Sequence, residues 1–356
     1  MKKTLLSLAA AAAVMSFGTM AAEAKVKACF IYVGPIGDFG WSYQHHQGAL
    51  EAQKQLGEDN VELAYLESVP EGADAERALE RFARSGCNII FTTSFGYMDA
   101  TNKVAGKFPD VKFEHATGYK REHPNVSTYN SKFHEGRYVQ GVIAAKMSKA
   151  GVAGYIASFP IPEVVLGINA FMLGAQSVNP DFKLKVVWAN TWFDPGKEAD
   201  AAKALIDQGA DIITQHTDST AAMQVAAERG VKAFGQASDM IKFGPDTQLT
   251  SIVDNWGPYY AKRIKAVMDG NWEQSDVWGG MADGHVVMAP YTNMPDDVKK
   301  AAEDTQAKIT GGFSPFTGPI NKQDGTEWLK AGEVADNGVL LGLNFYVKGV
   351  DDKLPQ

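Results

Sequence analysis

Cysteine is scarce in this sequence, and neither an excess of basic residues nor a membrane-spanning run is present. The 356 residues include two cysteines, Cys29 and Cys87, too few for a disulfide framework and without the Cys-x-x-Cys spacing of a zinc or redox site. Acidic residues outnumber basic ones by 42 to 34, and a net charge of −8 argues against a nucleic-acid-binding surface. Beyond the N-terminus, no run reaches the roughly 18 apolar residues that a membrane-spanning helix requires.

The N-terminus has the pattern of a secretory signal peptide. Two lysines precede an apolar run over residues 5–17, and alanines follow at positions 21, 22 and 24. We expect residues 1–24 to be removed and the mature protein to be periplasmic. A lipid anchor is not expected, because Lys27 lies just before Cys29, where lipoprotein signals are apolar or small. We expect Cys29 and Cys87 to be buried thiols on neighbouring strands, with a disulfide as the alternative in an oxidising compartment.

The mature chain alternates between strand and helix patterns. A buried strand is predicted over residues 28–33, and further strands over 61–66 and 88–93. Helical periodicity covers residues 42–56 and 73–83 between them. This βαβαβ order predicts an α/β fold with a parallel, doubly wound sheet and helices on both faces.

A weak internal repeat predicts a second lobe of the same kind. Residues 82–90 are echoed by residues 205–213, where a helix again ends at a glycine and an Ile-Ile strand follows. Each half also repeats the order of elements. We therefore expect two Rossmann-like lobes joined by three crossover segments near residues 126–129, 251–254 and 284–287. The predicted N-terminal lobe comprises residues 25–127 and about 254–284, and the C-terminal lobe comprises residues 128–253 and about 285–356.

The loops that follow the strands are the predicted ligand site, because ligands of doubly wound folds bind beyond the carboxyl ends of the strands. These loops combine aromatic side chains with acids and amides, which suits a planar polar ligand. Enzyme motifs are missing: Gly34 to Gly40 has the wrong spacing for a dinucleotide fingerprint, and neither a P-loop nor a Gly-x-Ser-x-Gly elbow is present. We therefore expect no catalytic residues, no metal and no cofactor.

Several short motifs together resemble the basic membrane protein family, whose members are ABC-transporter solute-binding proteins related to purine nucleoside receptors. The resemblance spans essentially the whole mature chain and rests on Asp38-x-x-Trp41, Phe133-His134-Glu135-Gly136-x-Tyr138-x-x-Gly141, Gly209-Ala210-Asp211-Ile212-Ile213, Leu249-Thr250-Ser251 and Tyr346-Val347-x-Gly349-Val350. It implies a type I periplasmic-binding-protein fold that encloses a purine nucleoside or base between its lobes. It also implies an ABC permease as partner of a monomeric receptor.

Two departures from the family pattern favour a free base. The family's ribose-binding aspartate falls on Ala237, and a lysine of the same site falls on Asp254. The motif that carries the family's stacking phenylalanine falls on residues 38–42 and places Trp41 there. Because Ala237 cannot accept a hydrogen bond from a hydroxyl group, we expect a base such as adenine. A purine nucleoside remains the first alternative, followed by a sugar-binding protein and a secreted nucleoside hydrolase.

The predicted ligand-binding residues combine the loop aromatics with acceptors for the N–H groups of a base. Trp41 is expected to stack on the base, with Phe159 or Trp192 on the opposite face. The full predicted set is Asp38, Trp41, Ser42, Phe95, Tyr97, Asp99, Phe159, Asn190, Trp192 and Asp239.

Overall fold

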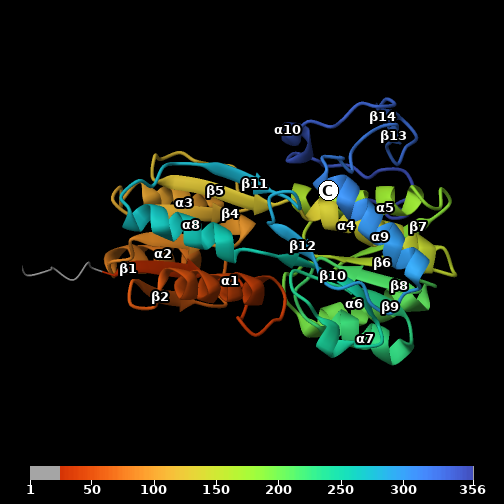
Figure 1. Ribbon diagram of the computed structural model, residues 1–356, viewed down its shortest axis with the longest axis horizontal. Helices are drawn as coiled ribbons and strands as arrows, with labels where there is room; N and C mark the ends of the chain where they lie inside the picture. Colours follow the sequence, from red (N-terminus) through yellow and green to blue (C-terminus); the bar gives the residue numbers. More distant parts are fainter. Residues whose placement is uncertain (1–24, 356) are drawn as a thin grey trace, which may run out of the picture.

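The computed structural model describes residues 25–355 and shows two α/β lobes side by side (Figure 1). The predicted signal peptide, residues 1–24, lies outside the described residues. Within residues 25–355, no helix is long and apolar enough to cross a membrane.

The N-terminal lobe is built on a six-stranded sheet in the order β11-β5-β4-β3-β1-β2, and its pairs are all parallel. Helices α1 and α8 pack together on one face, and α2 and α3 pack together on the other (Figure 1). Its strands are β1 (Val26–Ile31), β2 (Val61–Leu66), β3 (Ile89–Thr92), β4 (Lys112–Ala116), β5 (Val126–Ser131) and β11 (Asp276–Gly279). Its helices are α1 (Trp41–Leu56), α2 (Ala73–Arg84), α3 (Met98–Ala105) and α8 (Gly257–Met268).

The C-terminal lobe repeats this plan with the order β12-β10-β9-β8-β6-β7, in which β12 alone is antiparallel to its neighbour. Helices α4, α5 and α9 lie on one side, and α6 and α7 on the other. Its strands are β6 (Val152–Ala157), β7 (Lys183–Trp188), β8 (Ile212–Gln215), β9 (Lys232–Gly235), β10 (Gln248–Asp254) and β12 (Val286–Met288). Its helices are α4 (Phe133–Met147), α5 (Pro162–Gln176), α6 (Pro195–Asp207), α7 (Ala221–Arg229) and α9 (Asp296–Thr310).

Three segments carry the chain between the lobes. The chain leaves the N-terminal sheet after β5, returns after β10, and leaves again between β11 and β12. Each sheet therefore holds five strands from one half of the chain and a sixth strand from a later crossover. The carboxyl ends of the parallel strands of both sheets face the region between the lobes, which is where doubly wound folds bind ligands.

The C-terminal segment packs along the C-terminal lobe and ends in small elements, β13 (Ile320–Asn321), β14 (Glu327–Leu329) and α10 (Asn337–Leu340). Figure 1 shows α10 at the end of this segment that is nearer the N-terminal lobe. The fully buried Asn169 of α5 anchors the segment: its amide nitrogen donates to the carbonyl of Phe345 at 2.8 Å, and its amide oxygen accepts from the N–H of Val347 at 3.0 Å. These two hydrogen bonds hold the closing Tyr346-Val347 motif against α5, where both residues are buried.

The two cysteines correct an expectation from the sequence. Cys29 and Cys87 form a disulfide rather than two buried thiols, and their Cα atoms lie 6.0 Å apart. Cys29 belongs to β1, and Cys87 lies just before β3, which pairs with β1. The pairing of neighbouring strands thus brings together residues that are 58 positions apart, within the distance that a disulfide requires.

Candidate ligand-binding cleft

A narrow chamber of about 20 Å3 lies between the lobes at the carboxyl ends of the strands. Pockets for small molecules typically measure roughly 300–1,000 Å3, so the walls of this closed arrangement must move apart to admit a ligand. We call this space the first chamber. Its lining residues come from both lobes: Val33, Trp41, Ser94, Phe95, Thr117, Glu163, Trp192, His216, Asp218 and Gln236.

Three aromatic side chains form the apolar part of the first chamber. Trp41 begins α1, and its indole N–H donates to the carbonyl of Thr93 at 2.6 Å, which fixes the ring. Phe95 lies in a short 3-10 helix after β3. Trp192 follows β7, and Phe159 packs edge-on against it with ring centroids 5.1 Å apart. The aromatic surface therefore comes from both lobes.

The polar part of the first chamber is acidic. Asp218 is buried, and its Oδ2 has no hydrogen-bonding partner among residues 25–355. Burial raises the pKa of Asp218 well above its usual range, and the nearby Asp38 and Glu198 raise it further. Its carboxyl group therefore takes up a proton more readily than an exposed aspartate does, and in the protonated form it offers one donor and one acceptor.

His216 and Glu163 form a second polar group on the chamber wall. The Nε2 atom of His216 lies 3.6 Å from Oε1 of Glu163, and burial lowers the pKa of the imidazole. The ring is therefore neutral near pH 7 and can donate or accept. Nearby, the buried Arg137 donates to the carbonyl of Gln215 at 2.7 Å and to the side chain of Gln236, which fixes the Gln236 amide at the wall.

The lobes touch across the chamber. The hydroxyl of Ser238 donates to the carbonyl of Phe39, and the ammonium group of Lys242 lies 3.6 Å from the centroid of the Phe39 ring. Asp218 packs against Gly40, and the backbone N–H of Trp41 donates to the Asp218 carboxyl group. The structure is therefore a closed arrangement in which loops of both lobes enclose the first chamber.

Of the ten residues predicted from the sequence, the structure brings Trp41, Phe95 and Trp192 together at the first chamber, with Phe159 behind Trp192. In three others, the polar side-chain atoms already form hydrogen bonds with the backbone of the N-terminal lobe. The carboxylate of Asp38 accepts from the N–H groups of residues 40, 42 and 43 at the start of α1. Ser42 accepts from the N–H of Gly34, and Tyr97 donates to the carbonyl of Val69.

The remaining three predicted residues lie outside the lining of the first chamber. Asp99 is 81% exposed and pairs with Lys120. Asn190 is exposed in a left-handed turn, and Asp239 accepts from the N–H of Ile241 and from the Gln248 amide. Their side chains serve the surface and the local loops.

The sequence reasoning missed Glu163 and Thr117 entirely. Thr117 directly follows β4, a strand whose end the sequence pattern did not predict, and Glu163 lies in the first turn of α5 rather than in a loop. Among residues 25–355, no group of three or more His, Cys, Asp or Glu side chains could hold a metal ion.

Comparisons with known proteins identify the family and the fold of this chain. Residues 25–317 match the family described as PnrA-like ABC transporter substrate-binding proteins. The chain is 70% identical to a purine-binding protein of Brucella abortus, over 98% of this chain and 99% of that protein. It is 40% identical to a putative ABC transporter glucose-binding protein of Haloferax volcanii, over 93% of this chain and 81% of that protein. A solved solute-binding protein of an ABC transporter system from Aeropyrum pernix superposes with a TM-score of 0.70 at 21% identity, over 83% of this chain and 93% of that one.

Proposed function

We infer that this chain, which belongs to the family of PnrA-like ABC transporter substrate-binding proteins, binds a free purine base between its lobes, most readily adenine. The family is extracytoplasmic, and its members bind a small ligand and interact with a membrane permease. The purine-binding relative from Brucella abortus, at 70% identity, supports a purine as the ligand. In the proposed role, the protein captures the purine and delivers it to the permease, which requires no covalent step.

The single observation that carries the proposal is the combination of aromatic walls and a buried carboxyl group in one enclosed chamber. Stacking of a base on an aromatic side chain contributes roughly 1–3 kcal/mol per base. A protonated Asp218 offers a donor beside an acceptor, which complements the N6 amino group and the adjacent ring nitrogen of adenine. Guanine presents two adjacent donors on its N1 and N2 edge, which a protonated carboxyl group matches less well.

The positions that would hold a ribose support a base over a nucleoside. Ala237 is fully buried and presents a methyl group, so it cannot bind a hydroxyl group. Asp254 is also fully buried, and neither residue lines the first chamber among the described residues. The glucose-binding name of the Haloferax volcanii relative makes a sugar the main rival ligand.

Calorimetric titration with adenine, hypoxanthine, adenosine and glucose tests the proposed ligand. We expect adenine to bind most tightly and adenosine to bind at least about tenfold more weakly, because Ala237 offers no acceptor to a ribose hydroxyl group. Tighter binding of adenosine would show that the ribose is accommodated. Tighter binding of glucose would contradict a purine receptor.

Closure of the lobes gives a second prediction, at Gly40. A Cβ atom at this position would lie 2.7 Å from the Cα and 2.8 Å from the Cβ of Asp218, on the opposite lobe. Because all three nearest atoms belong to Asp218, the clash exists only in the closed arrangement. We expect Gly40→Ala to weaken adenine binding by roughly five- to hundredfold, from the 1–3 kcal/mol typical of overpacking.

Gly37→Ala is the matched control, since a Cβ atom there has no neighbour within 4 Å. It should bind adenine as the wild type does. Small-angle scattering of both variants with adenine should show a more open Gly40→Ala protein. Equal affinity and equal compaction of the two variants would disprove the closing contact.

A further inference from the structure

An aromatic contact joins the two lobes across the cleft. The ring of Phe39, in the loop between β1 and α1, packs edge-on against Phe243 of the C-terminal lobe, with ring centroids 4.9 Å apart. The ammonium group of Lys242 lies 3.6 Å from the centroid of the Phe39 ring and 4.9 Å from that of Phe243. The hydroxyl of Ser238 donates to the carbonyl of Phe39. We call Phe39, Ser238, Lys242 and Phe243 the interlobe latch.

An aspartate holds each side of the interlobe latch in place. Asp38 precedes Phe39, and its carboxylate accepts from backbone N–H groups at the start of α1. Asp239 precedes the side chains on the opposite lobe, and its carboxylate accepts from the first N–H of the short 3-10 helix η2 (Ile241–Phe243). Such bonds between a side chain and the nearby backbone fix the conformation of a loop. The two aspartates therefore position the two sides of the interlobe latch.

The backbone of Phe39 has an unfavourable conformation. Its φ angle is 61°, in the left-handed region that a bulky side chain rarely adopts. Such a conformation costs free energy and persists only where the surrounding structure enforces it. Contacts from Ser238, Lys242 and Phe243 can offset this cost only while the lobes are together, because all three residues belong to the other lobe.

The interlobe latch lies outside the space that a ligand can occupy. None of its four residues lines the first chamber or a second, larger chamber of about 240 Å3 that adjoins the first. The two chambers share the lining residues Phe95, Thr117 and Glu163. The first chamber can therefore widen toward the second while the latch stays in place.

We propose that the interlobe latch holds the lobes closed, both before and after a ligand binds, and thereby sets the affinity for every ligand of the cleft. The apparent Kd of a ligand that is bound by the closed protein rises as the closed fraction of the free protein falls. Because the latch lines neither chamber, its loss should weaken all ligands by the same factor. The proposal rests on the proposed function for its choice of ligands, but closure of the lobes can be measured without any ligand.

Phe39→Ala removes the ring that Lys242 and Phe243 contact. Calorimetric titration should show adenine and hypoxanthine bound at least about fivefold more weakly than by the wild type, with the ratio of the two affinities changed by less than about twofold. Unchanged affinities, tighter binding or unequal losses would overturn the proposal, because each would show that the ring does not act through closure.

Small-angle scattering without ligand separates the interlobe latch from the proposed function. Phe39→Ala should have a larger radius of gyration than the wild type, and its cooperative thermal unfolding would show that the variant is folded. Equal radii would overturn the proposal. If the radii differ but the wild type binds no purine, the latch stands and the proposed function fails.

Phe108→Ala is the matched control, because Phe108 is also a half-buried ring beside a cation. The guanidinium of Arg84 lies 5.3 Å from its centroid, but both residues belong to the N-terminal lobe. The variant should bind adenine within about twofold of the wild type and have the same radius of gyration. A loss of affinity equal to that of Phe39→Ala would overturn the proposal, since the effect would not come from the contact between the lobes.

Discussion

Replacing Trp41 and Trp192 together by alanine is expected to abolish most of the affinity for adenine. The two indole rings belong to opposite lobes and line the same chamber, so the double variant removes aromatic surface from both sides. At roughly 1–3 kcal/mol for each stacked face, the loss amounts to at least about thirtyfold in Kd, and Trp41→Ala alone should cost about tenfold. Calorimetry with adenine measures both values.

Trp41→Phe is the control for this experiment, since phenylalanine keeps an aromatic face. It should retain most of the affinity, although it loses the bond from the indole N–H to the carbonyl of Thr93. Thermal unfolding of each variant without ligand separates binding from folding, because Trp41 also packs against the cores of both lobes. A folded double variant with unchanged affinity would place the ligand elsewhere.

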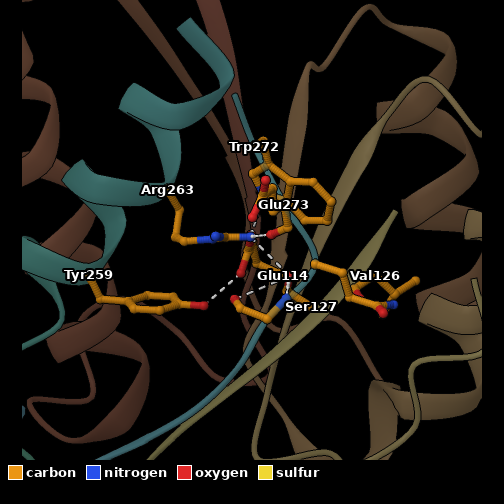
Figure 2. A network of polar contacts seen from close by, with 9 residues as sticks. Glu114, Val126, Ser127, Tyr259, Arg263, Trp272 and Glu273 are labelled. Atoms are coloured by element: carbon orange, nitrogen blue, oxygen red, sulfur yellow. Dashed lines mark hydrogen bonds and ion pairs between the residues drawn. The ribbon is translucent and has the colours of Figure 1, made fainter. Parts of the chain in front are cut away.

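The second large effect is expected on stability, at Glu114 in the N-terminal lobe (Figure 2). Its carboxylate is fully buried, and it accepts from the guanidinium of Arg263 at 2.6 Å and from the hydroxyl of Tyr259 at 2.7 Å. The indole N–H of Trp272 donates to the same carboxylate at 2.6 Å. The network thus ties β4 to α8 and to the segment that leads into β11.

Glu114→Gln should lower the free energy of unfolding by about 3–5 kcal/mol, because it leaves the Arg263 charge buried without its counter-charge. Urea denaturation measures this change. Adenine binding by the folded variant should be unaffected, since Glu114 does not line the first chamber.

Glu76→Gln is the matched control, since this carboxylate pairs with Lys103 and Lys107 at the surface. Its removal should not change stability measurably, because exposed ion pairs are screened by solvent. Equal losses in the free energy of unfolding of the two variants would show that the contribution of the Glu114–Arg263 pair to stability does not come from its burial.

Much of the fold was predictable because buried parallel strands and amphipathic helices leave strong periodic patterns. The predicted strand at residues 61–66 is confirmed as β2, and the predicted helices at 42–56 and 73–83 differ from α1 and α2 by one residue each. The two-lobed α/β fold is confirmed by the matching strand orders of the sheets. The resemblance to the basic membrane protein family is confirmed by the match over residues 25–317.

The candidate site was predictable only in part. The rule that ligands bind beyond strand ends identified the loops of Trp41, Phe95 and Trp192, which line the first chamber. The same rule cannot tell which way a polar side chain turns. Asp38 lies in such a loop, but its carboxylate binds the backbone N–H groups that open α1, a local alternative that competes with ligand binding.

Contacts between distant segments were beyond the reach of sequence patterns. The pKa of Asp218 is raised by its burial between the lobes and, further, by Asp38 of the other lobe, which closure places nearby. The disulfide between Cys29 and Cys87 likewise depends on the pairing of β1 with β3, which a list of strands does not specify. Both features come from tertiary packing.

The most direct test of the account is native mass spectrometry of the protein as purified, followed by denaturation and identification of any small molecule released. The account predicts one free purine base, most readily adenine, bound to each chain. If no ligand is carried over, the same measurement after incubation with an equimolar mixture of adenine, adenosine and glucose should show adenine bound. Retention of adenosine or glucose in preference to adenine would contradict the account.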